Sequence, residues 1–348
     1  MKRCTCRNSA WAQLRLLGGE RSFSRAPGPS RVTARMARRA LVTWLFLFAV
    51  GVGRALRADD TAPTRRESFK IAKAGNPIFL PVRIGSRQYH FLMDTGSAIT
   101  SFDTSLMGHL GGATSKEMIY TPYEDDPREV QRFRAPALSL GKATLRGAAE
   151  VICVDYRARG LTIDGEAPDG WLGIDALRDL IVQIDFDKGE LSRLPSVPAD
   201  SGSPVPLVWF RGVPCVRVSL DSGDVQFSTT ARFTVDTGGL SVQSGTIYGP
   251  VFRALLHYKL ASEAGRSREV TIANTTEART ARVADFRLGD FSHRRLVFTE
   301  ASCNSLSLEY LSRYVVTFDF PHMRIFLKPG ARYSDPDRAH ATHLHLRG

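Results

Sequence analysis

Two Asp-Thr-Gly triplets, at residues 94–96 and 236–238, are the part of this 348-residue sequence best suited to chemistry. Each follows a short apolar segment that predicts a strand, and each strand would deliver its Asp to a turn. Two carboxylates about 3 Å apart resist ionising together, so such a pair holds one proton. One carboxylate can then act as a general base toward a water and the other as a general acid. The triplets therefore predict a hydrolytic pair formed by Asp94 and Asp236.

The Thr and Gly residues of each triplet are suited to bringing two such turns close together. Gly96 and Gly238 lack a side chain, which lets the backbone pass close to a carboxylate. Thr95 and Thr237 carry a hydroxyl that can hydrogen-bond to the neighbouring copy and hold the two turns together. This interpretation requires the two triplets to meet around a pseudo-twofold axis.

The sequence around the triplets repeats itself, which indicates two copies of one structural unit. The repeated blocks, in the same order in both copies, are 77–85 with 213–221, 137–145 with 285–293, and 176–186 with 309–320. The predicted organisation is a leader and signal peptide at 1–58 (with Met36 as an alternative start), an N-terminal lobe at 72–195, a linker at 196–203, a C-terminal lobe at 204–330 and a tail at 331–348.

Short β-branched and aromatic runs alternate with Gly, Pro, Asp and Ser along both units, a pattern typical of barrels or sandwiches. We expect an all-β fold with one short helix in each unit, at Ile174–Asp179 and Leu308–Tyr314. Asp185 and Asp319 follow equivalent apolar strands, and we expect them to have a structural role in turns rather than a catalytic one.

These motifs resemble the pepsin/retropepsin superfamily of aspartic proteases, in its single-chain, two-lobed, retropepsin-like form. The resemblance is carried by Asp94-Thr95-Gly96-Ser97 after an apolar approach and by Trp171-Leu172-Gly173-Ile174, and it extends over about 72–330. It implies two pseudo-symmetric acid-protease β-barrel lobes with a cleft between them. It also implies a dyad of Asp94 and Asp236, an interlocking network of Thr95 and Thr237, and a hydrogen bond from Ser97 to the outer oxygen of Asp94.

The family covers its cleft with a β-hairpin flap that often bears a tyrosine. The resemblance places Tyr120 and Tyr123 in the corresponding interval of the first unit, with Tyr258 as the counterpart in the second. An ordinary aromatic residue in a loop is the alternative at each of these positions.

The second unit departs from the family pattern at two positions. Gly239 stands where a Ser, Thr or Ala is usual, so the outer hydrogen bond to Asp236 has no side chain to make it. Ser307 aligns with Gly173, and its side chain would crowd the active-site loop if the geometry of the first unit were strictly kept. A different packing in the second unit is the alternative. An inactive relative that binds peptides in the same cleft is therefore one alternative, and an unrelated secreted β-sandwich or surface domain is another.

The leading prediction is an exported aspartic endopeptidase that acts on a peptide or protein substrate as a monomer, without metal or cofactor. Residues 40–53 form an apolar run after Arg35, Arg38 and Arg39, as in a signal peptide. If this segment is not cleaved, it would anchor the chain to a membrane instead.

The high net charge of +12 does not indicate nucleic-acid binding, because it is concentrated in the leader. Residues 1–58 hold twelve Lys and Arg and one acidic residue, and the remainder holds 35 basic and 34 acidic residues. Beyond the leader, Cys153, Cys215 and Cys303 show no metal-ligand spacing, and either one disulfide or three free thiols would fit them. The histidines at 340, 343 and 345 are expected to lie in a solvated tail.

Overall fold

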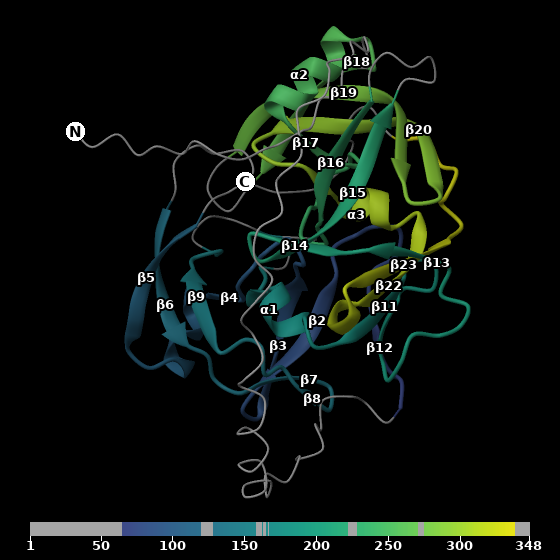
Figure 1. Ribbon diagram of the computed structural model, residues 1–348. Helices are drawn as coiled ribbons and strands as arrows, with labels where there is room; N and C mark the ends of the chain where they lie inside the picture. Colours follow the sequence, from purple (N-terminus) through teal and green to yellow (C-terminus); the bar gives the residue numbers. More distant parts are fainter. Residues whose placement is uncertain are drawn as a thin grey trace, which may run out of the picture. The chain divides into compact units, whose positions relative to one another are not determined.

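The strands of the computed structural model form three sheets (Figure 1). The structure describes residues 65–119, 128–157, 162, 165, 167–221, 228–270 and 275–337. In the strand Phe79–Ile84, Leu80, Val82 and Ile84 are buried, as a half-buried strand requires. The first sheet has the order β5-β6-β9-β4-β10-β3-β2-β7-β8. Its strands are β2 Phe79–Ile84, β3 Arg87–Met93, β4 Ser101–Asp103, β5 Ala113–Ile119, β6 Arg128–Arg134, β7 Leu138–Leu140, β8 Ala143–Thr144, β9 Glu150–Val154 and β10 Gly170–Leu172.

The second sheet is formed by the later part of the chain and has the order β14-β15-β16-β21-β17-β20-β19-β18. The two sheets share one feature at the ends of the strands that lead to the Asp residues. In the first sheet β3 pairs in parallel with β10, and in the second β16 pairs in parallel with β21. Its strands are β14 Val208–Phe210, β15 Val213–Asp221, β16 Ser228–Val235, β17 Gly245–Tyr248, β18 Ala261–Val270, β19 Thr275–Leu288, β20 Phe291–Ala301 and β21 Ser305–Leu306.

The third sheet joins the two halves of the chain in the symmetric order β1-β12-β11-β22-β23-β13. Its centre is the antiparallel pair β11 and β22, where Gln183 lies opposite Thr317 and donates a 3.0 Å hydrogen bond to its hydroxyl. The two halves therefore share one set of backbone hydrogen bonds. The strands are β1 Glu67–Lys70, β11 Ile181–Asp185, β12 Glu190–Leu194, β13 Ser203–Pro206, β22 Tyr314–Asp319 and β23 Arg324–Pro329.

Three α-helices and two 3-10 helices complete the described part of the chain. The helices α1 Ile174–Leu177 and α3 Leu308–Leu311 confirm the two short helices expected from sequence, although both are shorter than expected. The helix α2 Gly249–His257 was not expected, because nine residues contain too few turns to show a clear 3.6-residue period. The 3-10 helices are η1 Thr104–His109 and η2 Phe320–His322.

The Leu-Gly turns that repeat in the sequence adopt the same backbone conformation. Gly141, between β7 and β8, has a φ of +57°, and Gly289, between β19 and β20, has a φ of +56°. A glycine adopts this left-handed conformation at little cost, whereas other residues are strained there. The repeat in the sequence thus corresponds to a repeat in the backbone.

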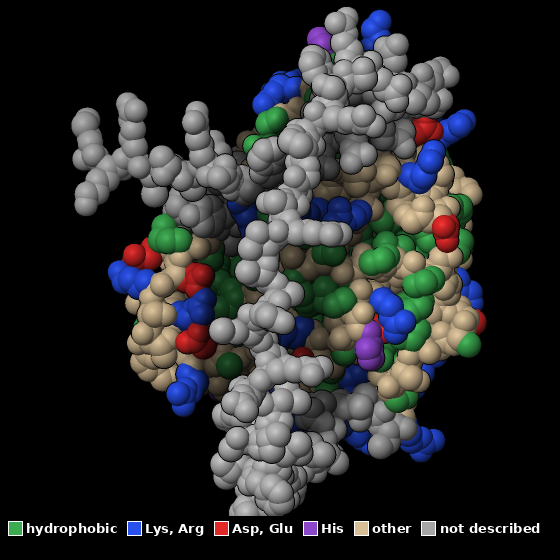
Figure 2. All heavy atoms as spheres, viewed as in Figure 1, with side chains coloured by type: hydrophobic (Ala, Val, Ile, Leu, Met, Phe, Trp, Pro, Cys, Tyr) green, Lys and Arg blue, Asp and Glu red, His purple; other side chains and the backbone are tan. Residues whose placement is uncertain are grey.

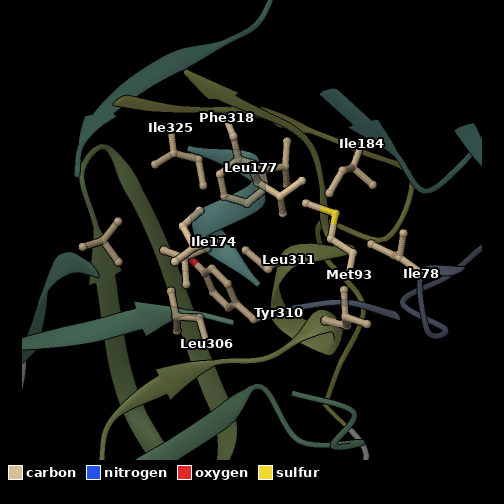
Figure 3. Close-up of a cluster of buried hydrophobic side chains, with 14 of the residues drawn as sticks. Ile78, Met93, Ile174, Leu177, Ile184, Leu306, Tyr310, Leu311, Phe318 and Ile325 are labelled. Carbon is tan, nitrogen blue, oxygen red and sulfur yellow. The ribbon is translucent and has the colours of Figure 1, made fainter. Parts of the chain in front are cut away.

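One hydrophobic cluster contains residues of both halves of the chain, and Figure 3 shows part of it. Met93, which precedes Asp94, belongs to it, and so does Leu306, which pairs with Val235 at the end of β16. The short helices contribute Ile174 and Leu177 from one half and Tyr310 and Leu311 from the other. Burial of apolar area contributes about 25 cal/mol per Å² to folding, so this shared core opposes separation of the halves.

The all-β prediction is confirmed by these three sheets, and all described residues belong to one compact unit. The predicted lobe and linker boundaries stay predictions. Among the described residues, no helix has the length and apolar character that crossing a bilayer requires. On the face drawn in Figure 2, Lys and Arg side chains are interspersed with Asp and Glu. The leader 1–58 lies outside the described residues, and the signal peptide also stays a prediction.

Candidate active site

The two Asp-bearing turns are positioned by the same strand arrangement in each half. Asp94 follows β3, and its backbone N–H donates a 3.0 Å hydrogen bond to the carbonyl of Leu172 in β10. Asp236 follows β16, and its N–H donates a 3.0 Å hydrogen bond to the carbonyl of Leu306 in β21. A parallel neighbouring strand thus fixes where each turn begins.

The two threonines lock the turns to each other through four hydrogen bonds. Thr95 N–H donates to Thr237 Oγ1 at 3.0 Å, and Thr237 N–H donates to Thr95 Oγ1 at 3.1 Å. Each hydroxyl then donates across the interface to a carbonyl, Thr95 to Val235 at 2.6 Å and Thr237 to Met93 at 3.0 Å. Both threonines are fully buried, so all of these polar groups are satisfied inside the protein.

The glycines of the triplets allow the opposite carboxylate to come close. A Cβ added at Gly96 would lie 2.5 Å from Oδ1 of Asp236, which is closer than real Cβ atoms approach an oxygen. A Cβ at Gly238 would collide with the carboxyl group of Asp94 in the same way. Each Asp thus lies against the backbone of the other turn, which brings the two carboxyl groups together.

The two carboxyl groups lie close together, since each of them lies against the glycine of the other turn. Burial, together with the charge of Asp236, raises the pKa of Asp94 well above its usual range. Burial also raises the pKa of Asp236, to about 6, while the hydrogen bond from Asp94 and the N–H of Gly238 oppose this rise. Two carboxyl groups that are so close keep one shared proton near neutral pH.

Backbone N–H groups hold each carboxylate in place. Asp94 Oδ1 accepts hydrogen bonds from the N–H of Gly96 at 2.8 Å and of Ser97 at 3.0 Å. Asp236 Oδ1 accepts from the N–H of Gly238 at 3.0 Å. The expected bond from the Ser97 hydroxyl to Asp94 is absent, since that hydroxyl donates to the carbonyl of Ile99 at 2.9 Å. The Ser97 backbone N–H makes the contact to Asp94 in its place.

The active-site loop of the first half is held by Thr100 and Asp175. The hydroxyl of Thr100 donates to Asp175 Oδ1 at 2.7 Å and accepts from the N–H of Gly173 at 3.1 Å. Gly173 is tightly enclosed, because a Cβ there would lie 2.6 Å from the carbonyl carbon of Ile99. Thr100 and Asp175 were not singled out in the sequence. The only signal for Asp175 was an acidic residue at the equivalent position of the second half, Glu309.

The active-site loop of the second half is longer and accommodates Ser307. The second half does not keep the geometry of the first, and Ser307 is hydrogen-bonded within the loop. Its backbone N–H donates to the carbonyl of Ser244 at 2.9 Å, and its hydroxyl donates to the carbonyl of Gln243 at 2.5 Å. In the first half the loop returns to β4 at Ser101, whereas in the second it continues to β17 at Gly245. The Ser307 side chain is buried in this loop, with its hydroxyl hydrogen-bonded.

Several other expectations concern residues outside this central arrangement. Tyr120 and Tyr123 lie outside the described residues, as do the histidines at 340, 343 and 345, and their roles stay predictions. Tyr258 follows the helix α2 instead of lying in a hairpin of strands. Asp185 and Asp319 stabilise turns: Asp185 accepts from the N–H of Lys188, and Asp319 pairs with Arg324.

The described cysteines are free thiols, and burial raises the pKa of each. Burial disfavours the thiolate, which is the reactive form of a cysteine. Within the described residues, no group of three or more His, Cys, Asp or Glu side chains is arranged to hold a metal ion.

Comparison with known proteins agrees with the geometry of the first half. A family model described as "Aspartyl protease" matches residues 80–176, a range that includes Asp94, Gly173 and Asp175. No curated protein matches the chain by sequence. Among solved structures, the chain is similar to the crystal structure of an aspartic proteinase from Irpex lacteus, with 14% identity and a TM-score of 0.48 over 78% of this chain and 100% of that one. The family match confirms the resemblance of this chain to the pepsin/retropepsin superfamily of aspartic proteases.

Proposed function

We propose that this protein is an aspartic endopeptidase in which Asp94 and Asp236 activate a water to hydrolyse peptide bonds. The family match and the all-β fold support aspartic protease function. The observation that carries the proposal is that the carboxyl groups of Asp94 and Asp236 lie close together where the two interlocked turns meet.

The pair has the two protonation states that this reaction needs. Burial raises the pKa of both carboxyl groups, so near neutral pH one of them keeps the shared proton and the other is a carboxylate. In the proposed reaction Asp94 is the acid and Asp236 is the carboxylate. The carboxylate takes a proton from water while the oxygen of that water attacks the peptide carbonyl carbon. Asp94 gives its proton to the carbonyl oxygen, which forms a tetrahedral diol. Asp236 then gives the proton that it took from water to the peptide nitrogen, while the ionised Asp94 takes a proton from a hydroxyl of the diol. The C–N bond breaks, the amine and the acid are released, and the pair again holds one proton.

Backbone groups around the two carboxyl groups support this chemistry, and the proposed reaction uses no cofactor. The N–H groups of Gly96, Ser97 and Gly238 hold the carboxylates in position before substrate arrives, which reduces reorganisation during the reaction. Both carboxyl groups come from one chain, so the proposed active form is a monomer. We also propose that the protein is exported, since residues 40–53 have the pattern of a signal peptide.

The test is cleavage of a mixed peptide library by residues 59–348 between pH 3 and pH 8, with and without a statine-type inhibitor of aspartic proteases. Asp94→Asn and Asp236→Asn are each expected to abolish turnover, because the two carboxyl groups act as a unit. Asp290→Asn is the matched control, since Asp290 is exposed in the turn between β19 and β20. Cleavage that survives either dyad substitution would refute the proposal. Peptide binding without turnover at any pH would indicate the non-catalytic alternative.

A further inference from the structure

The segment that follows β23 inserts a carboxylate into the interior of the second half. The side chain of Asp337 is fully buried, and it forms an ion pair with Arg313, whose side chain is 2% exposed. The same guanidinium donates to the carbonyls of Asp335 at 2.5 Å and Tyr333 at 3.3 Å. Burial of two charges is costly unless they are paired and hydrogen-bonded. Here the charges are paired, and both terminal nitrogens of Arg313 donate hydrogen bonds, while its Nε has no partner among the described residues.

The second oxygen of Asp337 reaches the loop that follows the Asp236 triplet. Asp337 Oδ2 accepts a 2.7 Å hydrogen bond from the hydroxyl of Ser244 and a 2.6 Å hydrogen bond from the N–H of Val297. Ser244 N–H in turn donates to the carbonyl of Val297 at 2.9 Å. Ser244 immediately precedes β17, which pairs in parallel with β20 (Figure 1). One buried carboxylate thus joins the end of this loop to the neighbouring strand β20.

Hydrogen bonds of Ser307 and of its neighbour Leu308 connect Ser244 to the backbone of Asp236. The carbonyl of Ser244 accepts from the N–H of Ser307, and the hydroxyl of Ser307 holds the carbonyl of Gln243. Leu308, the next residue, donates its N–H to the carbonyl of Gly239 at 3.2 Å. The N–H of Gly239 lies 3.4 Å from the backbone carbonyl oxygen of Asp236. Both ends of the loop 239–244 are therefore held by hydrogen bonds, and Asp337 supplies one of the anchors.

We propose that Asp337 is a positioning residue for the reaction, which acts through Ser244 to hold the loop 239–244 and with it the carboxyl group of Asp236. This inference rests on the proposed function. Asp337 lies more than a hundred residues after Asp236 and within the segment expected from sequence to be a tail. A charge-assisted hydrogen bond is stronger than a neutral one, so an anionic anchor restricts the loop more than a neutral side chain would. Small displacements of a catalytic group cost large factors in rate.

The primary test variant is Ser244→Ala, because it removes the link to the loop and leaves the ion pair of Asp337 and Arg313 intact. We expect kcat to fall about tenfold, as for the loss of one charge-assisted hydrogen bond, while KM stays within about twofold. Amide hydrogen exchange of residues 239–244 is expected to become faster. Ser201→Ala is the matched control, since the Ser201 hydroxyl is also buried but has no hydrogen-bond partner among the described residues.

Asp337→Asn and the double variant with Ser244→Ala test whether the two residues act through one contact. In a double-mutant cycle, the second substitution adds little to kcat when both remove the same interaction. Asp335→Asn is a control on the same segment, because the Asp335 side chain is about half exposed. Asp337→Asn leaves Arg313 without its counter-charge, and if that variant fails to fold, Ser244→Ala decides the question.

The outcomes separate this inference from the proposed function. If the wild-type protein cleaves peptides in a manner that Asp94→Asn abolishes, but Ser244→Ala keeps kcat within twofold and leaves exchange unchanged, the positioning role is overturned. Full additivity of Ser244→Ala and Asp337→Asn in kcat overturns it as well. If the wild-type protein shows no such cleavage, the proposed function fails, and the role of Asp337 is then judged by exchange of residues 239–244 alone.

Discussion

Removal of one carboxyl group from the dyad should stabilise the folded protein at neutral pH, and the substitution Asp236→Asn tests this. Burial raises the pKa of Asp236 from 3.8 to about 6 in the folded state. A group whose folded pKa is raised binds its proton more tightly when folded, so stability falls as pH rises from the unfolded value through the folded one. The amide side chain of the variant does not ionise, and the variant therefore avoids this loss.

The size of the effect follows from the two pKa values. A rise from 3.8 to about 6 corresponds to about 3 kcal/mol of free energy of unfolding. The wild-type protein and the variant should be equally stable below about pH 3, where Asp236 is mostly protonated in both folded and unfolded states. Above about pH 7, the variant should be more stable by about 3 kcal/mol.

The assay is urea unfolding at pH 4, 6 and 8, followed by tryptophan fluorescence, with the free energy of unfolding obtained by linear extrapolation. Asp290→Asn is the control for removal of an exposed carboxyl group. The reasoning is refuted if the difference between wild type and Asp236→Asn is the same at all three pH values. A variant that is less stable than wild type at pH 8 would also refute it.

Three further predictions concern the backbone and hydroxyl groups around the dyad. Gly96→Ala should lower kcat/KM for peptide cleavage by at least about 100-fold, because the added Cβ would displace the opposite carboxylate. Gly112→Ala is the control and should leave kcat/KM unchanged, because Gly112 lies at an exposed bend with open space around it. Gly173→Ser should prevent folding or abolish activity, because the side chain has no space. Ser307→Gly should lower the free energy of unfolding by only about 1 kcal/mol through loss of one hydrogen bond. If circular dichroism and urea unfolding show equal effects for the two substitutions, the difference between the two loops is contradicted. Thr95→Val should lower the free energy of unfolding by about 2 kcal/mol through loss of its buried hydroxyl, and an unchanged midpoint in urea would show that the interlocked turns do not depend on it.

The paired triplets, the repeat and the all-β class could all be predicted from the sequence because each depends on local patterns. An apolar run followed by Asp-Thr-Gly specifies a strand and a turn within a few residues, and its recurrence in a second copy indicates a symmetric partner. The Leu-Gly turns at Gly141 and Gly289 are local in the same sense, since the left-handed backbone conformation itself favours glycine.

The contacts around the dyad were decided by tertiary structure, because they join residues that are far apart in the sequence. Whether Ser307 crowds its loop depends on the length of the loop 239–244 and on the strand to which that loop returns. The Ser97 hydroxyl could reach more than one acceptor, and only the folded backbone places the carbonyl of Ile99 next to it. The burial of Asp337 against Arg313 and Ser244 has no local signal at all, since an aspartate near a chain end is usually solvated. Long-range packing thus determines which partner each polar group finds, while the local pattern determines where the turns that carry the chemistry lie.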